Sequence, residues 1–316
     1  MTILFLSLIA GLALLVWSAD RFIAGAVGLA HYYKLPPIVI GVVIVGFGTS
    51  APELLISGVA AWNDNSGLAV GNAIGSNITN IALVLGVTAL LTPIVVSENT
   101  LKREFPVLFA AMGLSWFFLS DGVLSLDNAL LLLLTLIIAL GYLAWAAKND
   151  GADLEEPEYF HSLRRSIFWS LAGLVLLLIS SEILVHAATN LAKAFGVSDL
   201  VIGLSIVAIG TSLPELAASV TGAIKHHTDI AIGNILGSNI FNILGVIGVP
   251  GLIQTYTIPK EVFVRDLPVM LGLTIILFIF SFATRKGNGM FRLTGIIFLL
   301  CFIAFETTLY IQSVPN

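Results

Sequence analysis

Charged residues are scarce in this chain: Asp, Glu, Lys and Arg make up 10% of its 316 residues, whereas 58% are apolar. Soluble domains carry about 25% charged residues. A chain with so few charges cannot cover a water-facing surface, which excludes a soluble globular protein. The composition predicts a polytopic membrane protein embedded in a lipid bilayer.

Cysteine is nearly absent too, since Cys301 is the only one. A single cysteine excludes an internal disulfide and a metal site built from thiolates. The net charge is −5 and no basic run occurs, so nothing in the sequence indicates nucleic acid as a partner. The first apolar stretch has no basic residue before Arg21 and no cleavage motif, and we interpret it as a retained span.

Long apolar runs, by contrast, fill the chain. A spanning helix needs about 20 mostly apolar residues, and the runs between turns and charges predict ten spans. The second, third, seventh and eighth also carry polar residues, and we expect these helices to be interrupted within the membrane. The ten expected spans lie near 3–29, 36–61, 67–92, 103–120, 125–147, 166–192, 198–224, 229–253, 263–283 and 291–312.

The basic residues between the spans are unevenly divided, which predicts the orientation. The crowded face carries ten of them and the other face only Lys193, Lys260 and Arg265. Lysine and arginine accumulate in cytoplasmic loops, so we expect both termini outside an integral plasma (inner) membrane protein. The residues of the crowded face are Lys34, Lys102, Arg103, Lys148, Arg164, Arg165, Lys225, Arg285, Lys286 and Arg292.

Two polar phrases occur twice, each time 162 positions apart. GTSAPE at 48–53 returns as GTSLPE at 210–215, and GNAIGSNITN at 71–80 returns as GNILGSNIFN at 233–242. Each copy belongs to a half with five spans, and because five is odd the halves must be oppositely oriented. We therefore expect two inverted five-helix repeats, 1–147 and 166–316, joined by an acidic cytoplasmic linker at 148–165. Such repeats place their substrate at their interface near the midplane.

Both copies of the first phrase carry a glutamate, Glu53 and Glu215, and a carboxylate within the membrane is functional by default. Residues four apart share one face of a helix, so Thr49 aligns with Glu53 and Ser76 with Asn80. The second copies repeat this arrangement with Thr211 and Glu215, and with Ser238 and Asn242. If the four helices meet, their polar faces form a cage of oxygen atoms.

An all-oxygen cage suits hard cations such as Na⁺, Ca²⁺ and Mg²⁺, whereas Zn²⁺ and copper favour His or Cys. None of the five histidines lies in a phrase, and no histidine-bearing metalloprotease motif occurs, so we expect no enzyme. The sequence implies no resident cofactor and no obligatory protein partner.

Pro52 and Pro214 lie two residues after Ser50 and Ser212, and proline distorts the turn before it. Carbonyls near 46–48 and 208–210 are thus free to face a cation. An alternative is that proline kinks and the pairs Gly71/Gly75 and Gly233/Gly237 only let helices pack closely. Two ionised glutamates would be neutralised by one Ca²⁺ or by two Na⁺, and this mutual exclusion favours antiport.

The two phrases resemble the α-repeats of the cation/calcium exchanger superfamily, and most closely those of its prokaryotic sodium/calcium exchangers. The resemblance covers nearly the whole chain and implies ten helices with both termini outside. Position 242 is linked in this family to ion preference and potassium dependence, and with Asn242 we expect no K⁺ co-transport. The ligands that the resemblance implies are the carbonyls of Gly46 and Ala208 and the side chains of Thr49, Ser50, Glu53, Ser76, Asn80, Thr211, Ser212, Glu215, Ser238 and Asn242.

The leading hypothesis is thus a secondary antiporter that exchanges Na⁺ for Ca²⁺ and extrudes Ca²⁺ by alternating access. One rival is a proton-coupled Ca²⁺ exchanger, because the same carboxylates can carry H⁺. Another rival, from a different class, is a passive cation channel.

Overall fold

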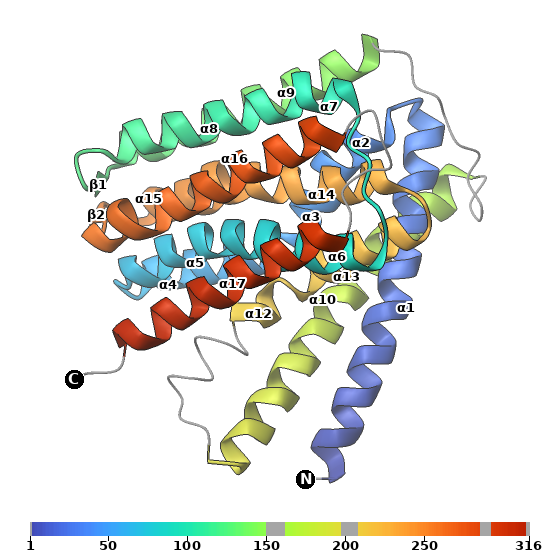
Figure 1. Cartoon of the computed structure of the whole chain (residues 1–316), viewed down its shortest axis with the longest axis horizontal. Coiled ribbons are helices and arrows are strands. Elements are labelled where there is room, and N and C mark those ends of the chain that lie inside the picture. Colours follow the sequence, from blue (N-terminus) through green and yellow to red (C-terminus); the bar gives the residue numbers. More distant parts are fainter. Residues whose placement is uncertain (1, 150–161, 197–207, 285–291, 314–316) are drawn as a thin grey trace.

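The computed structural model describes residues 2–149, 162–196, 208–284 and 292–313, and these are almost entirely helical. Most helices run side by side in one bundle, which α1 (Thr2–Tyr33) and α10 (Leu163–Ala194) cross steeply (Figure 1). The prediction of an all-α membrane protein is confirmed. Most of the expected linker, the first part of the seventh span, and Arg285 and Lys286 lie outside the described residues.

The first half of the chain contains long helices and shorter segments that continue one another. After α1 come α2 (Pro37–Ile40), η1 (Gly41–Val45), α3 (Gly46–Thr49), α4 (Ala51–Trp62), α5 (Ser66–Thr79), η2 (Asn80–Leu85), α6 (Gly86–Leu91), α7 (Glu98–Lys102), α8 (Glu104–Leu119), β1 (Val123–Leu124) and α9 (Leu126–Asn149). The segments labelled η are π-helical turns.

The second half repeats much of this order. After α10 come α12 (Ala208–Thr211), α13 (Leu213–Ile224), α14 (Thr228–Phe241), η4 (Asn242–Val246), α15 (Ile247–Ile253), β2 (Tyr256–Thr257), η5 (Val262–Asp266), α16 (Leu267–Thr284) and α17 (Arg292–Ser313).

Seven helices among the described residues are long and apolar enough to cross a membrane, and the bent pair Pro37–Thr49 and Ala51–Trp62 makes an eighth candidate. The fourth expected span is occupied by α8, whose 16 residues fall short of that length. The seventh is described only from Ala208 onward, as α12 and α13. The count of ten spans therefore stays a prediction.

The interruptions occur in two of the four expected helices. A bend of 43° separates the two parts of the second span at Ser50, and Ser212 separates α12 from α13. The expectation was wrong for the third and eighth spans, which run unbroken as Gly67–Leu91 and Thr228–Ile253. Neither has a proline next to its polar phrase, and a π-helical turn begins at Asn80 and at Asn242 instead. Such turns are frequent at functional sites.

The centre of the bundle is α14, in which every residue from Ile230 to Phe241 is buried. At one end of the bundle two short strands join neighbouring connections, since Val123 pairs with Thr257 and Leu124 with Tyr256 in an antiparallel ladder. This ladder was not expected from the sequence. It brings the connection after α8 and the connection after α15 to the same end of the molecule.

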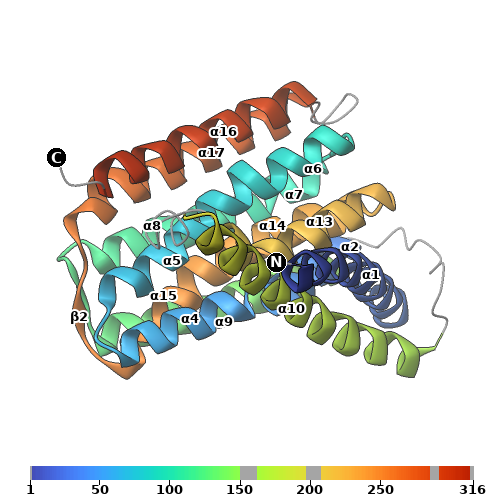
Figure 2. The same cartoon turned by 90° about the horizontal axis from the view of Figure 1, so that it is seen from below.

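The helices α1 and α10 pack closely through glycines at equivalent positions of the repeat, and Figure 2 shows the pair from below. Gly11 lies against Leu184, and Gly173, which is 162 positions after Gly11, lies against Phe22, which is 162 positions before Leu184. The two halves thus make equivalent contacts where these helices meet.

We expect Gly173→Ala to destabilise the protein by about 1–3 kcal/mol, the usual cost of overpacking. A Cβ atom added there would lie 2.7 Å from the backbone nitrogen of Phe22, so the two helices would have to separate. Gly113→Ala in α8 is the matched control, because nothing described lies within 4 Å of its added Cβ. Thermal unfolding in detergent measures the difference, and equal Tm values for the two variants would contradict this account of the packing.

Candidate functional site

Each repeated glutamate lies in the first turn of a helix that starts after a break. Glu53 follows Pro52 in α4, Glu215 follows Pro214 in α13, and both side chains are 1% exposed. Proline fits the start of a helix, where its missing N–H has no partner to lose. The free N–H groups and the dipole of a helix start stabilise negative charge. The break thus supplies the local environment that a buried carboxylate needs.

Hydrogen bonds link the two repeats directly at the breaks. The Ser50 hydroxyl donates to Glu215 Oε1 over 3.2 Å. The Thr49 hydroxyl reaches Asn234 Oδ1 at 3.1 Å and lies 3.4 Å from the hydroxyl of Ser238. Glu53 and Glu215 are close enough to repel each other electrostatically. The structure therefore gathers polar groups from both phrases of the second half around the break in the first half.

A pair of asparagines holds the glutamate-bearing helices in place. Asn72 of α5 donates through Nδ2 to the Glu53 carbonyl at 3.0 Å and to the Ser57 hydroxyl at 2.9 Å.

The second half makes the same contacts 162 positions later. Asn234 of α14 donates to the Glu215 carbonyl at 3.2 Å and to the Ser219 hydroxyl at 2.8 Å. The same scaffold thus occurs once in each half, and it fixes the first turn of α4 and of α13.

Several buried oxygen atoms of the repeated phrases have no hydrogen-bond partner among the residues that the structure describes. Buried polar atoms are nearly always paired, and the exceptions mark waters, ions or reactive groups. Buried acceptor oxygens without a hydrogen-bond donor are suitable ligands for a cation. They are Glu53 Oε2, Glu215 Oε2, Asn80 Oδ1, Asn242 Oδ1 and Ser212 Oγ.

The charge of the cluster comes from two carboxylates only. No group of three or more His, Cys, Asp or Glu gathers among the residues that the structure describes. The remaining oxygens belong to hydroxyl and amide groups, which are neutral. A cation bound here would be surrounded by many neutral oxygen dipoles and by at most two negative charges.

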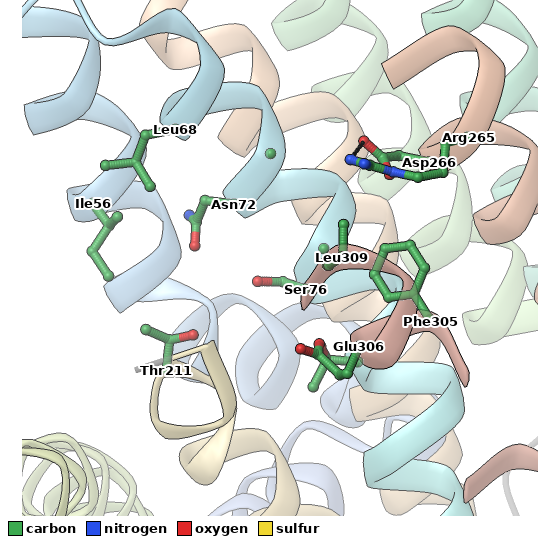
Figure 3. A pocket seen from close by; sticks show the side chains of 13 residues that line it. Ile56, Leu68, Asn72, Ser76, Thr211, Arg265, Asp266, Phe305, Glu306 and Leu309 are labelled. Carbon is green, nitrogen blue, oxygen red and sulfur yellow. Dashed lines mark hydrogen bonds and ion pairs between the residues drawn. The ribbon is translucent and has the colours of Figure 1, made fainter. Parts of the chain in front are cut away.

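A cavity of about 260 Å³ reaches the cluster from one side (Figure 3). Ser76, whose side chain lies near the Glu53 carboxyl, lies in its wall. The other lining residues come from α4, α5, α12, η5 and α17. They are Ile56, Leu68, Gly71, Asn72, Gly75, Thr79, Thr211, Arg265, Asp266, Phe305, Glu306 and Leu309.

The equivalent face in the other half is closed. Gly233 and Gly237 of α14 are buried, and an added Cβ at either would come within 2.5 Å of a backbone oxygen, of Ile38 or Val42. Their partners in α5 differ, since Gly71 is exposed and Gly75 half-buried. Close helix packing, the alternative role for these glycines, therefore holds for the second pair.

Comparison with known proteins identifies the family. The profile described as "Sodium/calcium exchanger protein" matches residues 3–145 and 165–311. This chain belongs to the sodium/calcium exchanger family. Its resemblance to the α-repeats of that family is thereby confirmed.

Relatives of the same kind match along nearly the whole chain. The putative antiporter CaxA of Alkalimonas amylolytica is 45% identical over 95% of this chain and 96% of its own. The inner membrane protein YrbG of Escherichia coli is 38% identical over 96% of this chain and 95% of its own. The solved sodium–calcium exchanger NCX_Mj, soaked with Na⁺ and Ca²⁺, superposes with a TM-score of 0.82 at 31% identity over 99% of both chains.

The expected ligands fall into three groups in the structure. The first group is linked by hydrogen bonds or lies close to the Glu53 carboxyl, and the Gly46 carbonyl accepts from Ser238 at 3.2 Å. Its members are Thr49, Ser50, Glu53, Ser76, Glu215 and Ser238. Asn80, Ser212 and Asn242 are buried, and Asn80 donates to the side-chain oxygen of Asn239 at 3.2 Å. Thr211 is half-buried at the cavity wall, and Ala208 begins α12 at the edge of the described residues.

One expected carbonyl is engaged elsewhere. The Gly210 carbonyl, at the end of the stretch 208–210, accepts a hydrogen bond from the Ser181 hydroxyl of α10 at 2.8 Å. A carbonyl freed by the proline-induced break is therefore also a place where a crossing helix can attach.

Sequence reasoning missed the asparagine scaffold, because helix spacing was used only within each phrase. Asn72 and Asn234 occupy the same place in the repeated phrase, and applying the 162-residue offset to every polar position would have singled them out. The contacts to Ser57 and Ser219, which lie outside the phrases, have no such signal.

We expect Asn234→Ala to lower stability by about 1–3 kcal/mol, the cost of leaving buried polar groups unpaired. The variant removes both donors to the Glu215 carbonyl and Ser219, and Asn234 is fully buried. Asn72→Ala removes the equivalent bonds beside the cavity, where water can replace them, so its Tm should fall less. Thermal unfolding of both variants tests this order, and a larger loss for Asn72→Ala would refute it.

Proposed function

We propose that this chain is a secondary antiporter that exchanges Na⁺ for Ca²⁺ across the plasma (inner) membrane and extrudes Ca²⁺. The observation that carries the proposal is the buried cluster around Glu53 and Glu215, built from both repeats of a sodium/calcium exchanger family member. The membrane assignment is supported by the relative YrbG, which is named an inner membrane protein. The ions are cargo, and the proposal requires no enzyme activity.

The ligand set proposed for these ions is the one that the sequence motifs indicate. Its unpaired acceptors are oxygens, which suits Na⁺ and Ca²⁺. An empty pocket would bury two unpaired carboxylates, and a pocket with both kinds of ion would hold excess positive charge. Both states are costly in a low-dielectric interior. One Ca²⁺ or two Na⁺ would balance the charge of −2, which favours exchange over leak.

The proposed topology is ten spans in two inverted five-helix repeats, 1–147 and 166–316, joined by the linker at 148–165, with both termini outside. It is supported by α8 and α13, shorter helices that lie within the expected fourth and seventh spans. It is also supported by the ladder between β1 and β2, which joins two connections that the topology places outside.

Alternating access is supported by the difference between the two halves. At the first break, Thr49 contacts Asn234 and Ser238, and all three are buried. The equivalent residues Thr211, Asn72 and Ser76 all line the cavity. We propose that the cavity is the outer access path, that the inner path is closed, and that the opposite state exchanges these roles.

We expect Glu53→Gln and Glu215→Gln each to abolish Na⁺-dependent Ca²⁺ flux in proteoliposomes, because either variant halves the charge that binds the ions. Glu98→Gln, at an exposed glutamate of α7, is the control and should transport normally. Each variant should elute as a folded protein in size exclusion. Wild-type flux in both glutamate variants would remove the two carboxylates from the mechanism.

The same preparation separates the rival functions. Ca²⁺ flux driven by a pH gradient without Na⁺ would indicate proton coupling, and steady Ca²⁺ uptake with no counter-ion would indicate a channel. Asn242 favours no K⁺ co-transport, so a K⁺ gradient should leave the flux unchanged.

Cysteine labelling tests which path is open. In a Cys301→Ala background, Ile56→Cys lines the cavity and should react with a membrane-impermeant thiol reagent added outside. Ala218→Cys, its equivalent 162 positions later, is fully buried and should not react from either side in this state. Preferential labelling of Ala218→Cys from outside would contradict the proposed orientation.

A further inference from the structure

The cavity contains a carboxylate that the predicted ion site does not use. Glu306 lies on α17, and Figure 3 shows its side chain pointing from that helix towards the space between Ser76 and Thr211. The sequence alone gave no reason to connect Glu306 with the repeated phrases. An ionisable side chain inside a spanning segment is functional by default.

Glu306 differs from the other acidic group of the cavity, which is already neutralised. Asp266 accepts from Arg265 Nε at 2.6 Å and from its Nη2 at 3.1 Å, and Arg265 also bonds Gln312. Among the described residues no hydrogen bond or ion pair engages the carboxylate of Glu306. Its negative charge is therefore available to a cation in the cavity.

The repeat shows that this carboxylate is present on one side only. The residue 162 positions before Glu306 is Ala144, whereas Arg265 and Asp266 have the counterparts Arg103 and Glu104, which form the same kind of ion pair. The two ends of the transport path would then differ in charge. A carboxylate required for folding or for the shared ion cage would be expected in both halves.

We propose that Glu306, with the hydroxyls of Ser76 and Thr211, forms an entry site that captures Ca²⁺ on its way between the outer water and the buried glutamates. The inference rests on the proposed exchange function and on the cavity being its outer path. Ser76 connects the two sites, since it lines the cavity and its side chain also lies near the Glu53 carboxyl. A carboxylate in a narrow cavity raises the local concentration of a divalent cation and thereby its rate of entry.

Vesicles of known orientation test this role. In right-side-out vesicles, Glu306→Gln should raise the KM for outer Ca²⁺ on the order of tenfold with the maximal rate retained. In inverted vesicles the KM for inner Ca²⁺ should stay unchanged. The KM of the wild type should also rise with added choline chloride, and that of the variant much less, because salt screens the attraction.

Two variants serve as controls. Glu306→Asp keeps the charge and should restore most of the affinity. Glu261→Gln removes an exposed glutamate that lies just before the ninth expected span, on the outer side in the proposed topology. This variant should behave as the wild type. If Glu306→Gln does not fold, Glu306→Ala takes its place, since alanine is the residue at the equivalent position, 144. An unchanged KM for outer Ca²⁺, equal changes on both sides, or a loss of maximal rate alone would overturn the proposal.

A binding measurement separates this proposal from the exchange function. In the Cys301→Ala, Ile56→Cys protein, Ca²⁺ in the cavity should slow alkylation, and Glu306→Gln should raise the half-protecting Ca²⁺ concentration by a similar factor. If the wild type shows no Na⁺-dependent flux but protection still depends on Glu306, the exchange function is wrong and the entry site stands. Protection that is independent of Glu306 overturns the entry site, whatever the flux.

Discussion

The structure depends on the cost of holding two carboxylates inside an apolar bundle. Each carboxylate lies at a helix start, which stabilises negative charge. Glu215 also accepts a hydrogen bond from the Ser50 hydroxyl of the opposite repeat. In the proposed function a cation would balance the remaining charge. The breaks at Ser50 and Ser212 exist where Pro52 and Pro214 prevent a continuous helix. Those breaks also free backbone carbonyls. The glutamate and the polar groups that can share in binding a cation beside it therefore come from the same short phrase.

The repeat gives a physical basis for the two states of similar energy that the proposed alternating access requires. Equivalent contacts occur in both halves, such as the asparagine scaffold and the glycine contacts between α1 and α10. A conformation in which the halves exchange roles would form similar contacts in the opposite places. The halves differ at their glycine pairs. Gly233 and Gly237 of α14 pack closely against α2 and η1, whereas Gly71 and Gly75 of α5 line the cavity. The proposed alternating access needs only this exchange and no new kind of contact.

Much of this arrangement could be predicted from the sequence, because its signals are local. The glutamates, the prolines beside them and the fixed offset indicate the composition of the site and the two helix breaks. The expected breaks in the third and eighth spans failed for a local reason, since polar residues alone do not interrupt a helix and no proline adjoins them. The short ladder between β1 and β2 arises from two connections over 130 residues apart in the chain, and contacts between distant segments leave no mark on either one.

The position of Glu306 shows where sequence reasoning ends and what geometry adds. In the sequence Glu306 belongs to no repeated phrase, and its relevance comes from the other elements that line the same cavity, α4, α5, α12 and η5. Adding a third carboxylate to the buried pair would give that cluster a charge of −3, which neither one Ca²⁺ nor two Na⁺ would neutralise. At the cavity wall the same charge attracts a divalent cation without belonging to the exchange step. A third carboxylate can thus speed the entry of Ca²⁺ only if it is not one of the ligands whose total charge one Ca²⁺ or two Na⁺ must neutralise. A carboxylate on the wall of the cavity satisfies that condition.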